Sequence, residues 1–146
     1  MFASDTTDIR TAAYGATLLR VSLGVLFLAH GLLKLLVFTP AGTAGFFESV
    51  GFPGFAAYPV ILAEIGGGAF LIAGVYTRLV SLGLVPIALG ATLVHLPFGW
   101  VFSNEGGGWE FPLFLAIAVG VQALLGAGAF ALKAPRLPFL PRPLAI

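Results

Sequence analysis

Residues 14–38, YGATLLRVSLGVLFLAHGLLKLLVF, form one apolar run that contains three ionisable side chains: Arg20, His30 and Lys34. A helix that crosses the hydrocarbon core of a bilayer needs about 20 residues, and this run is long enough. Its apolar residues are continuous rather than alternating, so the run predicts a membrane-spanning helix. An ionisable group near the bilayer centre costs roughly 3 kcal/mol, so these three side chains are expected to face protein rather than lipid.

The composition of the whole chain agrees with a lipid environment. Of its 146 residues, 59% are hydrophobic and only 9% are charged, whereas soluble proteins carry about 25% charged residues. The net charge of +1 provides no basic field, so no nucleic-acid partner is expected. The chain has no cysteine, which excludes disulfide bonds, thiol chemistry and cysteine-ligated metals within it. The lipid bilayer is therefore the first partner that the sequence predicts.

Three more apolar runs follow the first, and each is close to the length of a membrane span. The four predicted spans are residues 14–38, 55–75, 79–98 and 111–132. They predict an all-α integral membrane protein, an antiparallel four-helix transmembrane bundle that occupies residues 14–132. An N-terminal tail, residues 1–13, and a proline-rich tail, residues 133–146, flank this domain.

The basic residues outside the spans predict the orientation of the bundle. They are Arg10, Arg78, Lys133, Arg136 and Arg142. All five fall on one side of the bundle, because connections 39–54 and 99–110 contain neither lysine nor arginine. Basic residues accumulate in cytoplasmic loops, so both termini and both tails are predicted to be cytoplasmic.

Glycine pairs predict how the helices meet. Three spans each carry two glycines seven residues apart, which is nearly two helical turns: Gly24 and Gly31, Gly67 and Gly74, Gly83 and Gly90. Each pair is expected to mark a stripe on which the backbone of a neighbouring helix comes close.

Three ionisable residues are predicted to form a functional cluster in the outer half of the membrane. At a rise of 1.5 Å per residue, His30 lies ~12 Å and Glu64 ~13 Å below the outer ends of their helices. Lys34 lies one turn beyond His30 on the same face and is expected to pair with Glu64. We assign His30, Lys34 and Glu64 as the candidate catalytic cluster for protons or a ligand. A purely structural ion pair, or a Lys34 side chain that extends outward to the headgroups, is the alternative.

Arg20, His95 and Glu110 are further candidates for binding. Arg20 lies near the cytoplasmic end of the first span, where it could instead extend to the lipid headgroups. His95 and Glu110 lie near the outer ends of the last two spans, where solvated side chains are common. No metal site is expected, because the Glu-x-x-His spacing of di-metal bundles is absent.

Three segments carry a resemblance to a known family. They are LLRVSLGVLFLAHGLLKL (18–35), FFESVGFPGF (46–55) and AEIGGGAFLIAGVYTRL (63–79). The sequence resembles the DoxX family of small four-span bacterial and archaeal membrane proteins over residues 18–132. The residues that match the family pattern are Arg20, Gly24, His30, Gly31, Lys34, Glu64, Gly67, Gly74, Thr77 and Arg78. The resemblance implies a multi-pass protein of the bacterial or archaeal plasma (inner) membrane that is an oxidoreductase or an oxidoreductase subunit.

Two functional hypotheses follow, and the sequence leaves the choice between them open. In the first, a redox-linked protein handles a quinone or another lipophilic small molecule, with donors from His30 and Lys34 and protons passed between His30 and Glu64. No residue of the chain can hold an electron, so a cofactor or a membrane or periplasmic redox partner must supply it. In the second, the protein is a non-catalytic accessory or assembly subunit, and connection 46–55 binds the partner. A small-solute or proton pathway is a weaker third hypothesis.

Overall fold

The computed structural model describes residues 6–132 and residue 135, and this part of the chain is helical without any strand. Its elements are α1 (Thr6–Leu36), α2 (Pro40–Ser49), η1 (Gly54–Ala56), α3 (Ala57–Ala73), α4 (Thr77–His95), η2 (Leu96–Phe98) and α5 (Glu110–Leu125). The prediction of an all-α protein is confirmed. The proline-rich tail predicted at 133–146 lies outside the described residues, apart from Pro135.

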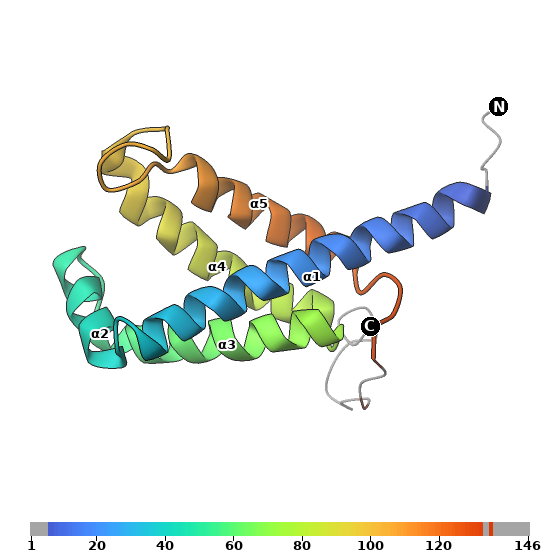
Figure 1. Cartoon of the computed structure of the whole chain (residues 1–146), viewed down its shortest axis with the longest axis horizontal. Coiled ribbons are helices and arrows are strands. Elements are labelled where there is room, and N and C mark those ends of the chain that lie inside the picture. Colours follow the sequence, from blue (N-terminus) through green and yellow to red (C-terminus); the bar gives the residue numbers. More distant parts are fainter. Residues whose placement is uncertain (1–5, 133–134, 136–146) are drawn as a thin grey trace.

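The four long helices are arranged as two antiparallel pairs (Figure 1). Helix α1 packs along α3, and α4 packs along α5, while smaller contacts of α3 with α4 and of α1 with α5 join the pairs. The short helix α2 and the loop between α4 and α5 lie toward the same side of the molecule in this view. This arrangement places both connections without basic residues at one end of the helices.

Three helices are long and apolar enough to cross a membrane: Ile9–Leu36, Gly54–Ala73 and Thr77–Phe98. The fourth predicted span, 111–132, is helical only as far as Leu125 and is a shorter apolar helix. It ends there because Gly126 adopts a φ of 81°, which breaks the helix. The chain beyond it bonds to neighbouring segments, with the Ala129 N–H donating to the Ala13 carbonyl and the Leu132 N–H to the Ala73 carbonyl.

Helix α1 begins at Thr6, well before the first apolar run at residue 14. The predicted N-terminal tail, 1–13, is therefore partly helical in the described residues. The polar residues that begin α1 contain neither glycine nor proline, so nothing in them stops a helix from extending past the apolar run. The start of α1 therefore does not mark the start of the predicted membrane span.

Helices α1 and α3 approach each other closely at glycines. A Cβ atom on Gly68 would lie 2.5 Å from the backbone nitrogen of Leu28, and one on Gly24 would lie 2.8 Å from the Gly68 carbonyl oxygen. A Cβ atom on Gly31 would lie 2.9 Å from the backbone nitrogen of Ile65. The predicted packing stripe at Gly24 and Gly31 is confirmed, and its partner on α3 is Gly68.

The glycine pairs of α3 and α4 do not form the packing stripes that their spacing predicts. Gly67 packs against Leu84 of α4, as expected, but Gly74 ends α3 with a φ of 77°. The predicted stripe at Gly83 and Gly90 is wrong, because a Cβ atom on either would have no neighbouring atom within 4 Å. Helix α4 instead buries a different face, which consists of Thr77, Ser81, Leu84, Ala88 and Thr92.

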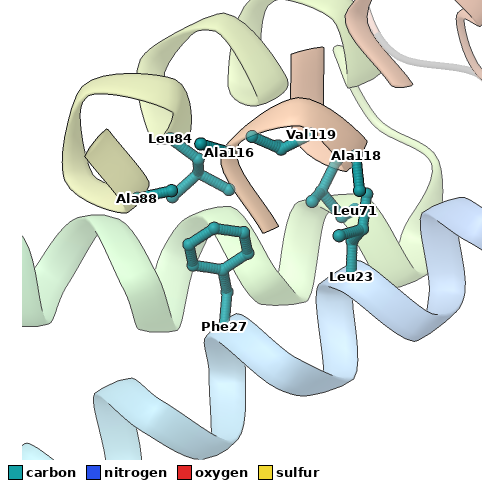
Figure 2. Packing of buried hydrophobic residues seen from close by; sticks show 8 residues of the cluster. All are labelled: Leu23, Phe27, Leu71, Leu84, Ala88, Ala116, Ala118 and Val119. Carbon is teal, nitrogen blue, oxygen red and sulfur yellow. The ribbon is translucent and has the colours of Figure 1, made fainter. Parts of the chain in front are cut away.

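Side chains from all four long helices meet in one hydrophobic core (Figure 2). The core consists of Leu23, Phe27, Leu71, Leu84, Ala88, Ala116, Ala118 and Val119. Figure 2 shows the Phe27 ring of α1 pointing toward Leu84 and Ala88 of α4. The core therefore connects the two helix pairs where they lie together.

The close approach of α1 and α3 can be tested with Gly68→Ala. The added methyl group meets backbone rather than a movable side chain, so we expect a loss of about 1–3 kcal/mol in the free energy of unfolding. Gly83→Ala is the matched control, because it adds the same group to a helix where no neighbour is within 4 Å. Unfolding in mixed detergent micelles, followed by circular dichroism, measures both variants. Equal stability of the two variants would contradict the α1–α3 contact.

Candidate functional site

A cavity of about 1130 Å³ lies between the two helix pairs, at the end that carries α2 and the loop between α4 and α5. Most of its lining is apolar, with many aromatic side chains. The ionisable residues among its walls are His30, Lys34, Glu64, His95 and Glu110. The structure therefore brings five of the six predicted site residues to one cavity, and Phe27 and Ala88 of the hydrophobic core form part of its lining.

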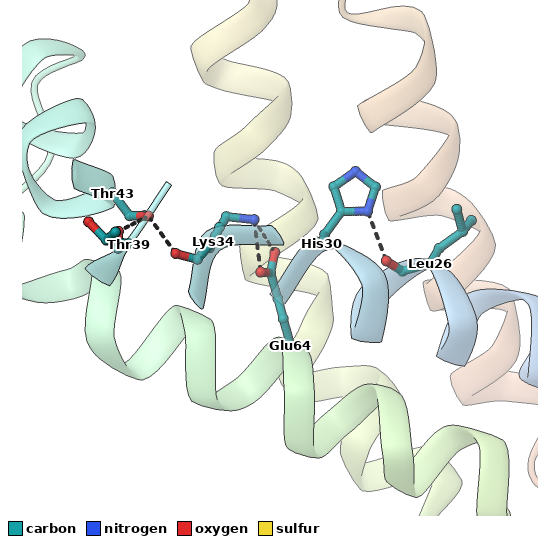
Figure 3. Close-up of polar contacts among 6 residues, drawn as sticks. All are labelled: Leu26, His30, Lys34, Thr39, Thr43 and Glu64. Carbon is teal, nitrogen blue, oxygen red and sulfur yellow. Dashed lines mark hydrogen bonds and ion pairs between the residues drawn. The ribbon is translucent and has the colours of Figure 1, made fainter. Parts of the chain in front are cut away.

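An ion pair between Lys34 and Glu64 joins α1 to α3 at the cavity wall (Figure 3). The Lys34 Nζ lies 2.9 Å from Oε1 and 2.8 Å from Oε2 of Glu64. The two side chains are 21% and 6% exposed, so the carboxylate is nearly buried. A glycine at position 31 allows this geometry, because a Cβ atom there would lie only 3.0 Å from the Cβ of Glu64. The pairing predicted between Lys34 and Glu64 is present.

Helix α2 is anchored beside this ion pair and covers one side of the cavity. The Thr43 hydroxyl donates to the Thr39 carbonyl at 2.9 Å and lies 3.4 Å from the Lys34 carbonyl (Figure 3). Thr39 caps α2 by accepting a hydrogen bond from the Gly42 N–H. These contacts hold α2 so that residues such as Phe46 line the cavity.

His30 lines the cavity without contacting the ion pair. Its Nδ1 lies 2.8 Å from the Leu26 carbonyl oxygen, one turn earlier in α1 (Figure 3). Its only hydrogen bond in the described part of the chain is this one, so a direct proton transfer between His30 and Glu64 is not built into the structure. The three residues predicted as one cluster are therefore an ion pair and a separate imidazole that share a cavity.

His95 on α4 repeats the arrangement of His30. Its Nδ1 lies 2.7 Å from the Ala91 carbonyl oxygen, and its ring meets Phe98 edge-on. On the helix, His95 projects well away from the predicted stripe at Gly83 and Gly90. That stripe does not pack against another helix, so its direction did not identify the interior face.

Glu110 holds the loop between α4 and α5 over the cavity. Its Oε1 accepts a hydrogen bond of 2.9 Å from the Phe102 N–H. The carboxylate belongs to the first turn of α5, where the helix dipole favours a negative charge. The rings of Trp100 and Trp109 lie 4.5 Å apart between their centroids and stiffen the same loop. Phe102 and Trp100 thereby become cavity walls.

Arg20 does not line the cavity, although it was predicted among the binding residues. It is 1% exposed, so the alternative in which it extends to the headgroups does not describe it either. Its guanidinium donates to the Leu71 and Ile72 carbonyls at 3.0 and 3.2 Å and to the Ala129 carbonyl at 3.3 Å. These bonds satisfy two carbonyl groups at the C-terminal end of α3 and one in the chain after α5, which is a structural role.

The sequence reasoning missed the aromatic walls of the cavity. Segment 46–55 was interpreted as a docking loop, and connection 99–110 was given no role apart from the binding candidate Glu110. The residues from them that line the cavity are Phe46, Phe47, Val50, Phe52, Trp100, Phe102, Gly107, Gly108 and Glu110. Their aromatic content was the available signal. Within the described residues, no group of three or more histidine, aspartate or glutamate side chains could hold a metal ion.

Comparisons with known proteins place the chain among membrane proteins. The family model described as DoxX matches residues 15–97. A Bacillus subtilis (strain 168) protein named "Putative oxidoreductase CatD" is 34% identical over 121 residues, which cover 81% of this chain and 84% of that protein. "Inner membrane protein YqjF" of Escherichia coli (strain K12) is 31% identical over 120 residues, which cover 81% of this chain and 88% of that protein. No solved structure matches this chain.

The ion pair predicts a specific pattern of stabilities. Lys34→Met leaves the Glu64 carboxylate nearly buried without its partner, so we expect a loss of about 3 kcal/mol in the free energy of unfolding. The double variant Lys34→Met with Glu64→Leu removes both charges and should recover most of that loss. The free energies of unfolding of the single and double variants in mixed micelles, compared as a double-mutant cycle, measure this coupling.

Glu105→Gln is the matched control, because Glu105 is an exposed carboxylate in the loop between α4 and α5. It should change the stability by less than about 0.5 kcal/mol. Additive losses from the two single changes, Lys34→Met and Glu64→Leu, would show that the two charges do not interact.

Proposed function

The chain belongs to the DoxX family of membrane proteins, and from this premise we propose that it is a redox-linked membrane component that handles a quinone or another lipophilic small molecule. The observation that carries the proposal is the cavity, which combines extensive apolar walls with a few ionisable side chains. Ligand pockets have this composition, because apolar contact provides affinity and a few polar groups fix orientation.

The size of the cavity suits a ring with part of a hydrocarbon tail. Its volume of about 1130 Å³ is slightly above the ~300–1000 Å³ that small-molecule pockets span. Rings such as Phe27, Phe52 and Trp100 line it and can stack on a flat ligand. A lipophilic ligand would reach it from the surrounding lipid.

The polar groups supply the acid–base part of such chemistry. The Lys34 ammonium can donate to a ligand oxygen, and His30 and His95 can exchange protons with it. Electrons must come from a redox partner or a cofactor, because no side chain of this chain carries them. The name of the B. subtilis relative supports a redox setting, and it is that protein to which the name refers.

We further propose that α1, α3, α4 and α5 form an antiparallel four-span bundle in a bacterial or archaeal plasma membrane, with both termini cytoplasmic. The E. coli relative is named as an inner membrane protein, which supports this location. Helix α5 has 16 residues, or ~24 Å at 1.5 Å per residue, and is short for a core of ~30 Å. The chain after Gly126 bonds to α1 and α3, which makes non-helical backbone at this depth tolerable.

An accessory or assembly subunit is the second candidate, and exposed aromatic side chains favour it. Phe55 and Phe102, in the two connections at the cavity end, are 75% and 69% exposed. Aromatic residues are enriched at protein interfaces. A membrane or periplasmic redox protein that docks there would lie next to the cavity.

The ligand proposal can be tested by gentle purification from native membranes, followed by mass spectrometry of lipids and proteins. We expect a quinone or a related lipophilic ring in near-stoichiometric amount. Ala91→Phe fills part of the cavity and should lower that amount at least about tenfold, which corresponds to 1.4 kcal/mol. Leu93→Phe is the matched control, because it adds a ring to the same helix at an exposed position outside the cavity lining. A stoichiometric protein partner with no small molecule would favour the accessory role instead.

The orientation can be tested with single cysteines, since the chain has none of its own. Glu105→Cys lies in the loop at the cavity end, and Ala12→Cys is exposed near the start of α1. A membrane-impermeant thiol reagent should label Glu105→Cys on intact cells. It should label Ala12→Cys only after the membrane is permeabilised. The reverse pattern would overturn the proposed orientation.

A further inference from the structure

Both histidines of the chain hold their rings in the same way. In His30 and in His95, Nδ1 lies within hydrogen-bond distance of the carbonyl oxygen four residues earlier, at 2.8 and 2.7 Å. A carbonyl oxygen only accepts, so Nδ1 must carry the proton in each ring. A neutral imidazole has one N–H, which leaves Nε2 as a bare acceptor in both side chains.

These two acceptors belong to the wall of the cavity. His30 lines it from α1 and His95 from α4. In the part of the chain that the structure describes, no hydrogen bond satisfies either Nε2. Gly107 leaves room beside the second ring, since a Cβ atom there would lie 3.6 Å from the Nε2 of His95. Both acceptors are therefore available to a ligand.

Lys34 adds one donor to this set. Two of its three N–H groups point to Oε1 and Oε2 of Glu64, which leaves one for a ligand. Lys34 and His30 are four residues apart in α1, so they lie on the same helix face. Both side chains line the same cavity, so one ligand can accept from Lys34 and donate a hydroxyl hydrogen to His30.

We propose that the cavity selects a hydroxylated aromatic ring of the phenol class over the corresponding ring ether. This inference rests on the proposed function and narrows it to the hydrogen-bond-donating form of the ligand. A ring hydroxyl satisfies an acceptor on His30 or His95, whereas an ether oxygen leaves both of them without this hydrogen bond. His30 is exposed and His95 is half-buried, so the expected preference is that of about one net hydrogen bond.

The same geometry supports one chemical step. The O–H bond of the hydroxyl breaks as its proton moves to Nε2 of His30, and an N–H bond forms there. The negative charge that develops on the ring oxygen lies in the same cavity as the ammonium of Lys34, which stabilises it. No electron moves in this step. The site is thus built to take a proton from a bound phenol.

Binding of a matched pair of probes tests the inference. The full chain in lipid nanodiscs is titrated calorimetrically with 4-pentylphenol and with 4-pentylanisole, its methyl ether, and uptake by empty nanodiscs is subtracted. One satisfied hydrogen bond corresponds to about a tenfold tighter binding of the phenol. His30→Phe and His95→Phe should each reduce that preference several-fold. Leu33→Phe, which adds a ring to α1 outside the cavity lining, should leave it unchanged.

The outcomes separate this inference from the proposed function. If both probes bind equally well, the cavity takes lipophilic rings and the selection of a hydroxyl is overturned. A preference that survives both histidine substitutions would overturn it as well. If folded protein binds neither probe, the proposed function itself fails, and the inference fails with it.

A second measurement needs no variant. The chain contains only two histidines, so labelling with ¹⁵N-histidine gives just two rings to follow by NMR. At pH 8, both rings should show a protonated Nδ1 and a bare Nε2, and 4-pentylphenol should shift the Nε2 signals. A protonated Nε2 in either neutral ring would overturn the inference.

Discussion

The close contact between α1 and α3 determines where the polar groups of the cavity lie. Gly24, Gly31 and Gly68 let the two backbones approach so nearly that a methyl group would not fit between them. At this separation Lys34 reaches both oxygens of Glu64, which a wider spacing would prevent. In lipid, an ionisable side chain needs such a partner far more than it does in water. The helix contact and the ion pair therefore depend on each other.

The two ends of the molecule use their polar residues for different purposes. At the end of α3, the two terminal nitrogens of the Arg20 guanidinium donate to backbone carbonyls, and the side chain is almost completely buried. At the opposite end, the ionisable side chains line an open cavity and leave hydrogen-bonding capacity unused. Phe27 and Leu84 of the hydrophobic core lie between these regions. The structure thus separates a region that holds the fold from one that can receive a ligand.

Sequence reasoning predicted the features that depend on a single helix or on depth in the membrane. The apolar runs predicted the helices, and the similar depths of His30 and Glu64 predicted that both lie toward the same end of the bundle, where they line one cavity. The pairing of Lys34 with Glu64 followed because charges on facing helices at one level need each other.

The features that were missed depend on longer-range geometry. The end of α5 follows from the backbone of Gly126, and the stripe at Gly83 and Gly90 failed because glycine spacing does not say which face meets a neighbour. The aromatic walls depend on how two connections fold back over the helices. Thr39 takes a φ of 62° at the start of one of them, and no pattern in the chain predicts that.

The hydrogen bonds of the cavity also limit the kind of ligand that fits. Both oxygens of Glu64 are occupied by Lys34, and the Nδ1 atoms of both histidines are occupied by their own helices. A proton therefore has no direct bonded path from His30 to Glu64, and a ligand that bridges the cavity must complete any such path. Because the charges of Lys34 and Glu64 cancel, their pair neither attracts nor repels a net charge strongly. A neutral lipophilic molecule with a polar head meets these conditions better than an ion does.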